Sequence, residues 1–129
     1  MTLDEIAAQL PDVLHDAGLR TLAIDYAANK ATFGVRVCVG DPDAVTEAER
    51  EAHRAVTLTI SGLLWCVIEG PGIGYTAAVE ELRIDAGSVD SLKNRPLLPV
   101  VPDGAFAWWI FVQQWNACIY VAGRSASVE

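Results

Sequence analysis

His15 and Asp16 form the only His-Asp dipeptide in the 129-residue sequence, and both side chains can take part in acid–base and metal chemistry. In metal-dependent phosphohydrolases an adjacent His-Asp pair supplies ligands to a divalent ion. Two histidines, His15 and His53, could share a metal with a carboxylate such as Asp16 or Asp25. No spacing in the sequence enforces such a site, and we predict neither a metal nor any other cofactor.

The same dipeptide also has a structural interpretation. It follows a helical segment and precedes a strand, where a histidine suits the end of a helix and an aspartate can accept hydrogen bonds from nearby amides. We favour this interpretation. The alternative, a catalytic or ligand-binding site, requires His15, Asp16 and a further polar side chain to converge around a cavity.

Other short motifs do not match catalytic patterns. Gly70-Pro71-Gly72-Ile73-Gly74 has the glycine content of a phosphate loop, but Tyr75-Thr76 follows it in place of the Lys-Ser/Thr pair. No G-x-S-x-G elbow is present. The carboxylates Glu80-Glu81 are typical of a solvated surface. We therefore predict no catalytic residue and interpret the protein as non-enzymatic, with a small metal-dependent hydrolase or ligand-binding domain using His15 and Asp16 as the alternative.

The four tryptophans indicate a binding surface. Trp108 and Trp109 are adjacent, so on a strand they point to opposite faces, and one of them should enter the core. The other needs cover from a second layer or a partner, or it lies exposed. Exposed tryptophans are typical anchors of protein interfaces and also of sugar-binding platforms. The candidate binding residues are therefore His15, Asp16, Asp25, Trp109 and Trp115.

Charge and composition restrict the possible partners. Seventeen acidic residues against nine basic ones give a net charge of −8, which disfavours contact with nucleic acid and with anionic membranes. The same charge would speed association with a basic protein. Hydrophobic residues make up 52% of the chain, and in a domain of this size part of that apolar surface is expected to lie in an interface. We expect a homodimer or another homo-oligomer.

The sequence also indicates a cytoplasmic location. The first ten residues, MTLDEIAAQL, lack the basic region of a secretory signal, and the apolar runs are shorter than a membrane span. Cys38, Cys66 and Cys118 lie far apart in apolar runs. That pattern predicts buried, reduced thiols.

Hydropathy periods predict a mostly β chain with one helix at its start. Thr2 and Glu5 form the pattern of a capping box, which begins a helix. The helix either ends near Gln9 or restarts with Pro11 in a first turn, and Gly18 is placed to terminate the turn that follows. Alternating apolar residues at 22–26 and 33–39 predict an antiparallel hairpin with one buried face. Further strands are expected near 56–60, 63–69 and 79–87, and two more within 106–127, with their turn near Gln114 to Asn116.

We therefore expect a single α+β domain over residues 1–129, mostly β. In this arrangement the N-terminal helix packs on an antiparallel sheet of six to seven strands, curled into a sandwich or a partial barrel. Strands do not alternate with long helices, so a parallel α/β sheet is not expected.

Four segments carry a resemblance to known proteins: LHDAGLRTLAIDY, VGDPD, HRAVTLTISGLLWCVIE and WNACIYVAG. Together they resemble uncharacterised small bacterial proteins that carry an "HDA" step into their first strand and end in a strand pair. Some of these proteins are assigned, by gene neighbourhood, as immunity proteins of toxin systems. The resemblance implies occlusion of a basic partner by an acidic protein. His15, Asp16 and Asp25 match its N-terminal pattern, and it implies no catalytic residues.

Overall fold

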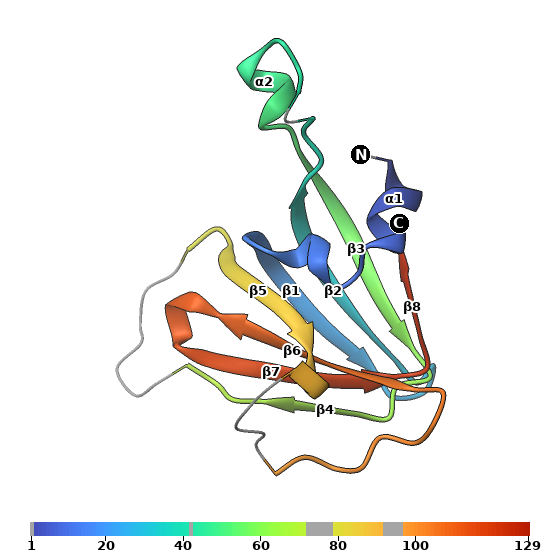
Figure 1. The fold of residues 1–129 in the computed structure, drawn as a ribbon. Helices are drawn as coiled ribbons and strands as arrows, with labels where there is room; N and C mark the ends of the chain where they lie inside the picture. The colour runs from blue at the N-terminus through green and yellow to red at the C-terminus, as the bar shows by residue number, and fades with distance from the viewer. Residues whose placement is uncertain (1, 42, 72–78, 92–96) are drawn as a thin grey trace.

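The computed structural model describes residues 2–41, 43–71, 79–91 and 97–129. Two α-helices, three 3-10 helices and eight strands occur within these ranges (Figure 1). In chain order they are α1 (Leu3–Ala8), η1 (Asp12–Leu14), β1 (Ala17–Asp25), β2 (Lys30–Cys38), α2 (Glu47–Arg50), β3 (His53–Ser61), β4 (Trp65–Ile68), β5 (Leu82–Ser88), η2 (Val89–Ser91), β6 (Phe106–Val112), η3 (Gln113–Trp115), β7 (Ala117–Gly123) and β8 (Ser125–Val128).

The strands form one antiparallel sheet in the order β4-β7-β6-β5-β1-β2-β3-β8. The sheet is open, with β4 and β8 as its edge strands, and it is strongly curved (Figure 1). The predicted class, mostly β with antiparallel pairing, is confirmed. The predicted count of six to seven strands is wrong, because the described residues form eight. The strand that the prediction lacked is β8, a short segment of small residues whose alternation is too weak to recognise.

Strands β7 and β8 follow one another along the chain but have different neighbours. β7 pairs with β4, whereas β8 pairs with β3. The change of neighbour takes place at Arg124, whose N–H donates to the carbonyl of Ser61 at 3.0 Å. Close by, the N–H of Leu64 donates to the carbonyl of Ala122 at 2.8 Å. These two bonds stabilise the bends at 61–64 and 122–124, where the chain passes between the two halves of the sheet.

The N-terminal helix begins as the sequence predicts. The Thr2 hydroxyl accepts from the Glu5 N–H, and the Glu5 carboxylate accepts from the Thr2 N–H. The helix is only six residues long, however, and Ile6 is its one buried residue, with Leu3 partly buried against the core. The expected packing of a helix layer on the sheet is therefore reduced to one core side chain.

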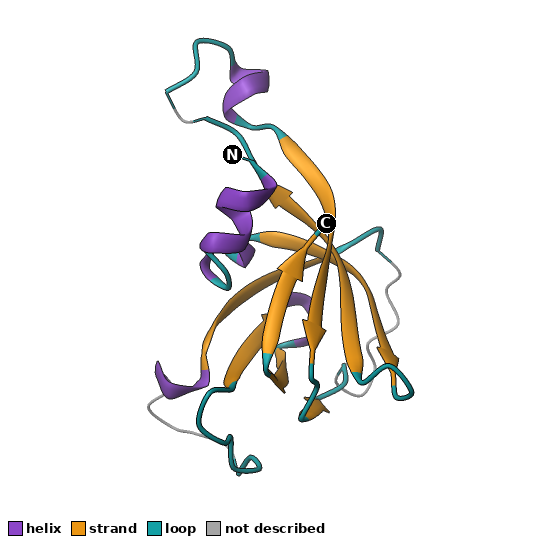
Figure 2. Ribbon diagram, turned by 90° about the vertical axis from the view of Figure 1, so that its right-hand side faces the viewer, coloured by secondary structure: helices purple, strands orange, loops and turns teal. Residues whose placement is uncertain are grey.

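The first hairpin has the predicted pairing. β1 and β2 run antiparallel from Asp25↔Lys30 to Gly18↔Arg36, with an irregularity between Leu19 and Thr21. The charged excursion after β2 forms α2, which stands clear of the sheet beyond the ends of β2 and β3 (Figure 2). None of the described helices is long and apolar enough to cross a membrane.

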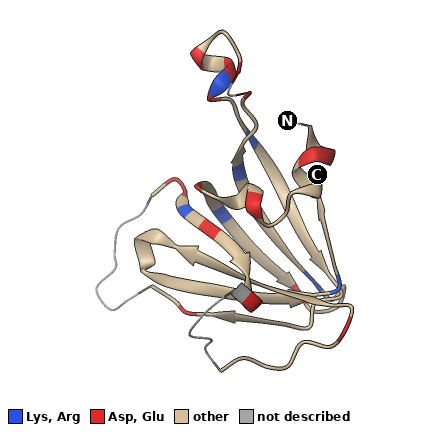
Figure 3. Ribbon diagram, viewed as in Figure 1, with Lys and Arg blue, Asp and Glu red and all other residues tan. Residues whose placement is uncertain are grey.

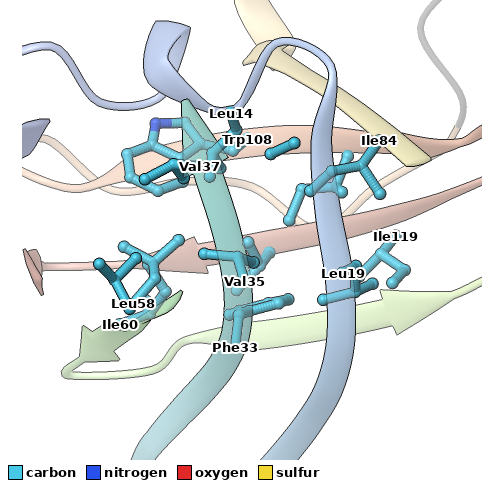
Figure 4. Packing of buried hydrophobic residues seen from close by; sticks show 14 of the residues in the cluster. Leu14, Leu19, Phe33, Val35, Val37, Leu58, Ile60, Ile84, Trp108 and Ile119 are labelled. Atoms are coloured by element: carbon cyan, nitrogen blue, oxygen red, sulfur yellow. The ribbon is translucent and has the colours of Figure 1, made fainter. Parts of the chain in front are cut away.

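The core lies inside the curve of the sheet (Figure 4). Alternate residues of the strands on both sides point into it, and Trp108 joins them as the predicted inward tryptophan. Complete burial of each large aliphatic or aromatic side chain contributes roughly 1.5–3 kcal/mol. The largest side chains with almost no exposed surface are Phe33, Ile6, Leu14, Leu58, Ile60, Ile84, Ile110 and Ile119.

The cysteines are all unpaired, but their predicted burial is wrong in one case. Cys38 is exposed, because β2 alternates and the preceding Val37 takes the inward position. Cys66 and Cys118 are half-buried. Most of the glycine-rich motif, Gly72 to Gly74, lies outside the described residues, as do Tyr75 and Thr76.

Candidate functional site

The site begins with a row of residues across three neighbouring strands. Gly18 of β1 is paired with Arg83 of β5 on one side and with Arg36 of β2 on the other. Its neighbours Ala17 and Leu19 are core residues, so Gly18 and the two arginines belong to the outer face. The row therefore places a residue without a side chain between two guanidinium groups.

A cavity of about 140 Å³ lies over this row, and we call it the polar cleft. His53 also reaches it, from β3. Four of the described side chains that line it are charged, two acidic and two basic. The lining includes Asp16, Gly18, Arg36, Glu81, Arg83 and Gln114.

Glu81 fills the space above Gly18. Arg36 Nη2 donates to Glu81 Oε1 at 2.6 Å, and Arg20 Nε lies 3.6 Å from Glu81 Oε2. Partial burial alone would raise the pKa of Glu81, but the hydrogen bond from Arg36 and the positive charges of Arg36 and Arg20 outweigh it and hold the pKa below its usual value. The sequence-based view of this carboxylate as solvated surface is wrong, because only a quarter of its side chain is exposed.

Asp85 anchors the turn at His15 and Asp16 that leads into β1. Its Oδ1 contacts His15 Nδ1 and accepts from the Asp16 N–H at 3.2 Å, while its Oδ2 accepts from Gln113 Nε2 at 3.4 Å. Asp16 has a φ of 58°, a left-handed conformation that aspartate tolerates better than most residues. His15 itself is 80% exposed. The dipeptide is thus the turn between η1 and β1, anchored by a carboxylate of β5.

The two residues of the dipeptide point to different places. Asp16 lines the polar cleft, where its Oδ1 lies 3.6 Å from Arg83 Nε. His15 contacts Asp85 beside the cleft and is not among the lining residues. The backbone N–H of Arg83 donates to Gln114 Oε1 at 3.0 Å, and this bond holds η3 against β5 at the edge of the cleft.

The other residues predicted from the sequence lie elsewhere. Asp25 is at the far end of β1, where its Oδ1 accepts from the Ala28 N–H at 2.9 Å and stabilises the hairpin turn. Trp109 is half-buried on β6, with its ring against Gly87. Trp115 is also half-buried and packs against the core.

Sequence reasoning missed most of the polar cleft. Arg36 of β2 lies far along the chain from Glu81 and Arg83, which stand at the start of β5, and each looks like an ordinary outward residue of a strand or its flank. One signal was present. A glycine inside a strand often marks a close approach of another group, whereas Gly18 was interpreted only as the end of a turn.

A second group of polar side chains lies on β4 and β7, outside the cleft. Glu69 Oε1 accepts from the Cys118 N–H at 2.8 Å. Burial raises the pKa of Tyr120 to about 12, with further contributions from its hydrogen bond to Cys118 and from the charge of Glu69. Burial also raises the pKa of the Cys118 and Cys66 thiols, which disfavours reactive thiolates there.

The arrangement is better suited to recognition than to metal chemistry. Among the described residues, no group of three or more His, Cys, Asp or Glu side chains could hold a metal ion. Arg36 and Arg83 can instead engage an acidic group and Asp16 a basic one. Comparison of the chain with protein-family models, with curated proteins and with solved structures returned no match.

Proposed function

We propose that this chain is a non-enzymatic binding protein whose polar cleft receives a charged group of a protein partner. The observation that carries the proposal is the row Arg83–Gly18–Arg36, which places two guanidinium groups around one cavity together with Asp16 and Glu81. Charged pairs of this kind give specificity to an interface and fix its register.

The size and lining of the cleft support recognition of a small group. Pockets for whole small-molecule ligands generally measure about 300–1,000 Å³. At about 140 Å³ the polar cleft suits the end of one side chain or of a polypeptide. The described residues that line it include no serine, threonine or cysteine that could serve as a nucleophile.

The partner is either another protein or a second copy of this chain. The net charge of −8 favours a basic partner, and occlusion of such a partner in the manner of an immunity protein is one form of the proposal. The described acidic residues are distributed over many elements (Figure 3). Self-association is favoured by Val67 and Ile68 on the edge strand β4, which are 37% and 48% exposed. We place the protein in the cytoplasm, where unpaired cysteines stay reduced.

One observation favours a second candidate function, a small hydrolase or ligand-binding domain that uses His15 and Asp16. Asp85 contacts His15 Nδ1, and an aspartate in that position orients a histidine so that Nε2 can accept a proton. No partner of Nε2 occurs among the described residues. This function would require a ligand to contact both His15 and the cleft.

Native mass spectrometry of the protein, isolated gently from the organism that makes it, tests the proposal. We expect a stoichiometric second protein or a homo-oligomer, which Arg83→Ala in the cleft weakens by about tenfold or more. Arg124→Ala is the matched control, because it removes the same charge at the β7–β8 bend. Equal effects of the two substitutions would contradict a role for the cleft. A bound metal or small molecule lost on substitution of His15 or Asp16 would support the second candidate.

A further inference from the structure

Basic residues are scarce in this chain, yet three of the nine come together at the polar cleft. Arg36 and Arg83 line the cavity on either side of Gly18, and Arg20 lies behind the Glu81 carboxylate. They belong to β2, β5 and β1, which are neighbours in the sheet (Figure 3). Such a concentration of guanidinium groups in a chain of net charge −8 marks a site for an anionic group.

The carboxylate of Glu81 lies among these arginines, but it accepts few of the hydrogen bonds that they can donate. Among the described residues, only Oε1 accepts a hydrogen bond, at 2.6 Å from Arg36 Nη2. Oε2 is buried and has no hydrogen-bond partner within the described part of the chain, since Arg20 Nε is 3.6 Å away. The ion pair recorded for the Arg83 side chain is with Asp16 and is loose, at 3.6 Å. A carboxylate that is not tethered to the backbone at position 81 could accept hydrogen bonds from both Arg36 and Arg83 in bidentate geometry.

Glu81 can also leave without breaking the sheet. It precedes β5, which begins at Leu82, so its side chain can rotate away while the pairing of β5 with β1 and β6 persists. Its neighbour Glu80 is already 87% exposed and lies 3.7 Å from Arg20 Nη2. Removal of Glu81 therefore leaves a second carboxylate close to Arg20.

We propose that Glu81 is an internal substitute for the ligand, and that the polar cleft binds a carboxylate group of the partner when the Glu81 side chain moves aside. This inference rests on the proposed function and specifies its chemistry: the recognised group is an acidic side chain or the C-terminal carboxylate of a polypeptide. The lining itself indicates this class, because the carboxylate of Glu81, at the wall of the cavity, already accepts a hydrogen bond from Arg36 and lies close to Arg20.

Titration of Glu81→Ala with acetate tests the inference, followed by the NMR signals of the Gly18 amide and the Arg36 and Arg83 side chains. We expect saturable shifts, with an affinity about tenfold higher than that of the wild-type protein, a difference of about 1.4 kcal/mol. Glu80→Ala is the matched control, because it removes an equal charge one residue away and leaves Glu81 in place. Chloride at equal ionic strength controls for screening.

Several outcomes would overturn the inference. Equal shifts in Glu81→Ala and Glu80→Ala would show that only net charge matters, and saturable binding of inorganic phosphate without acetate would show that the ligand class is wrong. If Glu81→Ala does not fold, Glu81→Gln keeps the shape of the side chain without its charge and should bind acetate more tightly than wild type. Loss of acetate binding leaves the partner measurement with Arg83→Ala intact, so the two proposals fail separately.

Discussion

The carboxylate of Glu81 lies where a side chain at position 18 would stand. A Cβ added to Gly18 would be 2.6 Å from Glu81 Oε2, closer than real Cβ contacts. Gly18 has no positive φ, so its lack of a side chain, and not its backbone freedom, is what the structure uses. The ion pair of Glu81 with Arg36 therefore depends on a glycine in the neighbouring strand.

Gly18→Ala should destabilise the protein by displacing Glu81 from Arg36. Insertion of a methyl group into a filled site costs about 1–3 kcal/mol, whereas alanine in place of glycine in a strand gains roughly 0.5–1 kcal/mol. We expect a net loss of about 1 kcal/mol in the free energy of unfolding, measured in urea. In a Glu81→Ala background the loss should become a gain of roughly 0.5–1 kcal/mol, because the methyl group then has space and only the preference for alanine over glycine in a strand remains.

Gly70→Ala serves as the control for this substitution, since a Cβ at that glycine meets nothing within 4 Å. A loss of equal size with and without Glu81 would assign the effect to the backbone of β1 and contradict the contact.

Acid should remove the contribution of Glu81 to stability. Partial burial opposes the charged form, but the hydrogen bond from Arg36 and the charges of Arg36 and Arg20 prevail and lower the pKa of Glu81 below its usual value in the folded state. A carboxyl group of lowered pKa stabilises the fold at pH values above its unfolded pKa, and this stabilisation is lost as the pH falls through the folded pKa. The difference in unfolding free energy between wild type and Glu81→Gln should therefore shrink on acidification. A difference that stays constant from about pH 7 to about pH 3 would contradict the ion pair.

Strands with strong alternation were predictable because one face of each is buried. The hairpin of β1 and β2 follows from Leu22, Phe33 and the other inward residues, which repeat with the period of a strand. In β8 the alternation is weak, because only Ala126 and Val128 are partly buried. Its serines and alanine pair with β3 only because the chain bends at Arg124, and a bend of that kind depends on tertiary contacts.

The polar cleft was beyond sequence reasoning for a different reason. His15 and Asp16 are adjacent in the sequence, but adjacent residues in a turn point in different directions, and of these two only Asp16 lines the cleft. Arg36 and Arg83 complete the site because both are paired with Gly18, one from each neighbouring strand. That register follows from the order of strands in the whole sheet. No local pattern encodes the order β5-β1-β2.

Gly87→Ala should destabilise the pairing of β5 with β6. A Cβ at Gly87 would lie 2.5 Å from Trp109 Cζ2, and an indole ring anchored in a strand cannot move aside as a flexible side chain does. We expect a loss of about 1–3 kcal/mol in unfolding free energy and a change in tryptophan fluorescence. In a Trp109→Leu background the substitution should cost much less, and an unchanged cost would show that the ring does not rest on Gly87.

Alkaline pH should destabilise the protein through Tyr120. Burial, together with the hydrogen bond to Cys118 and the charge of Glu69, raises the pKa of this phenol from 10.0 to about 12 in the folded state. A raised pKa stabilises the fold while the group is protonated in both states, and this stabilisation is lost as the pH rises from the unfolded pKa through the folded one. Unfolding free energy should thus fall between about pH 10 and about pH 12 in wild type, and fall less in Tyr120→Phe. Tyr26, which is 87% exposed, gives the matched control Tyr26→Phe. If that variant alters the alkaline transition as much as Tyr120→Phe does, the packing of Tyr120 against Cys118 is not its cause.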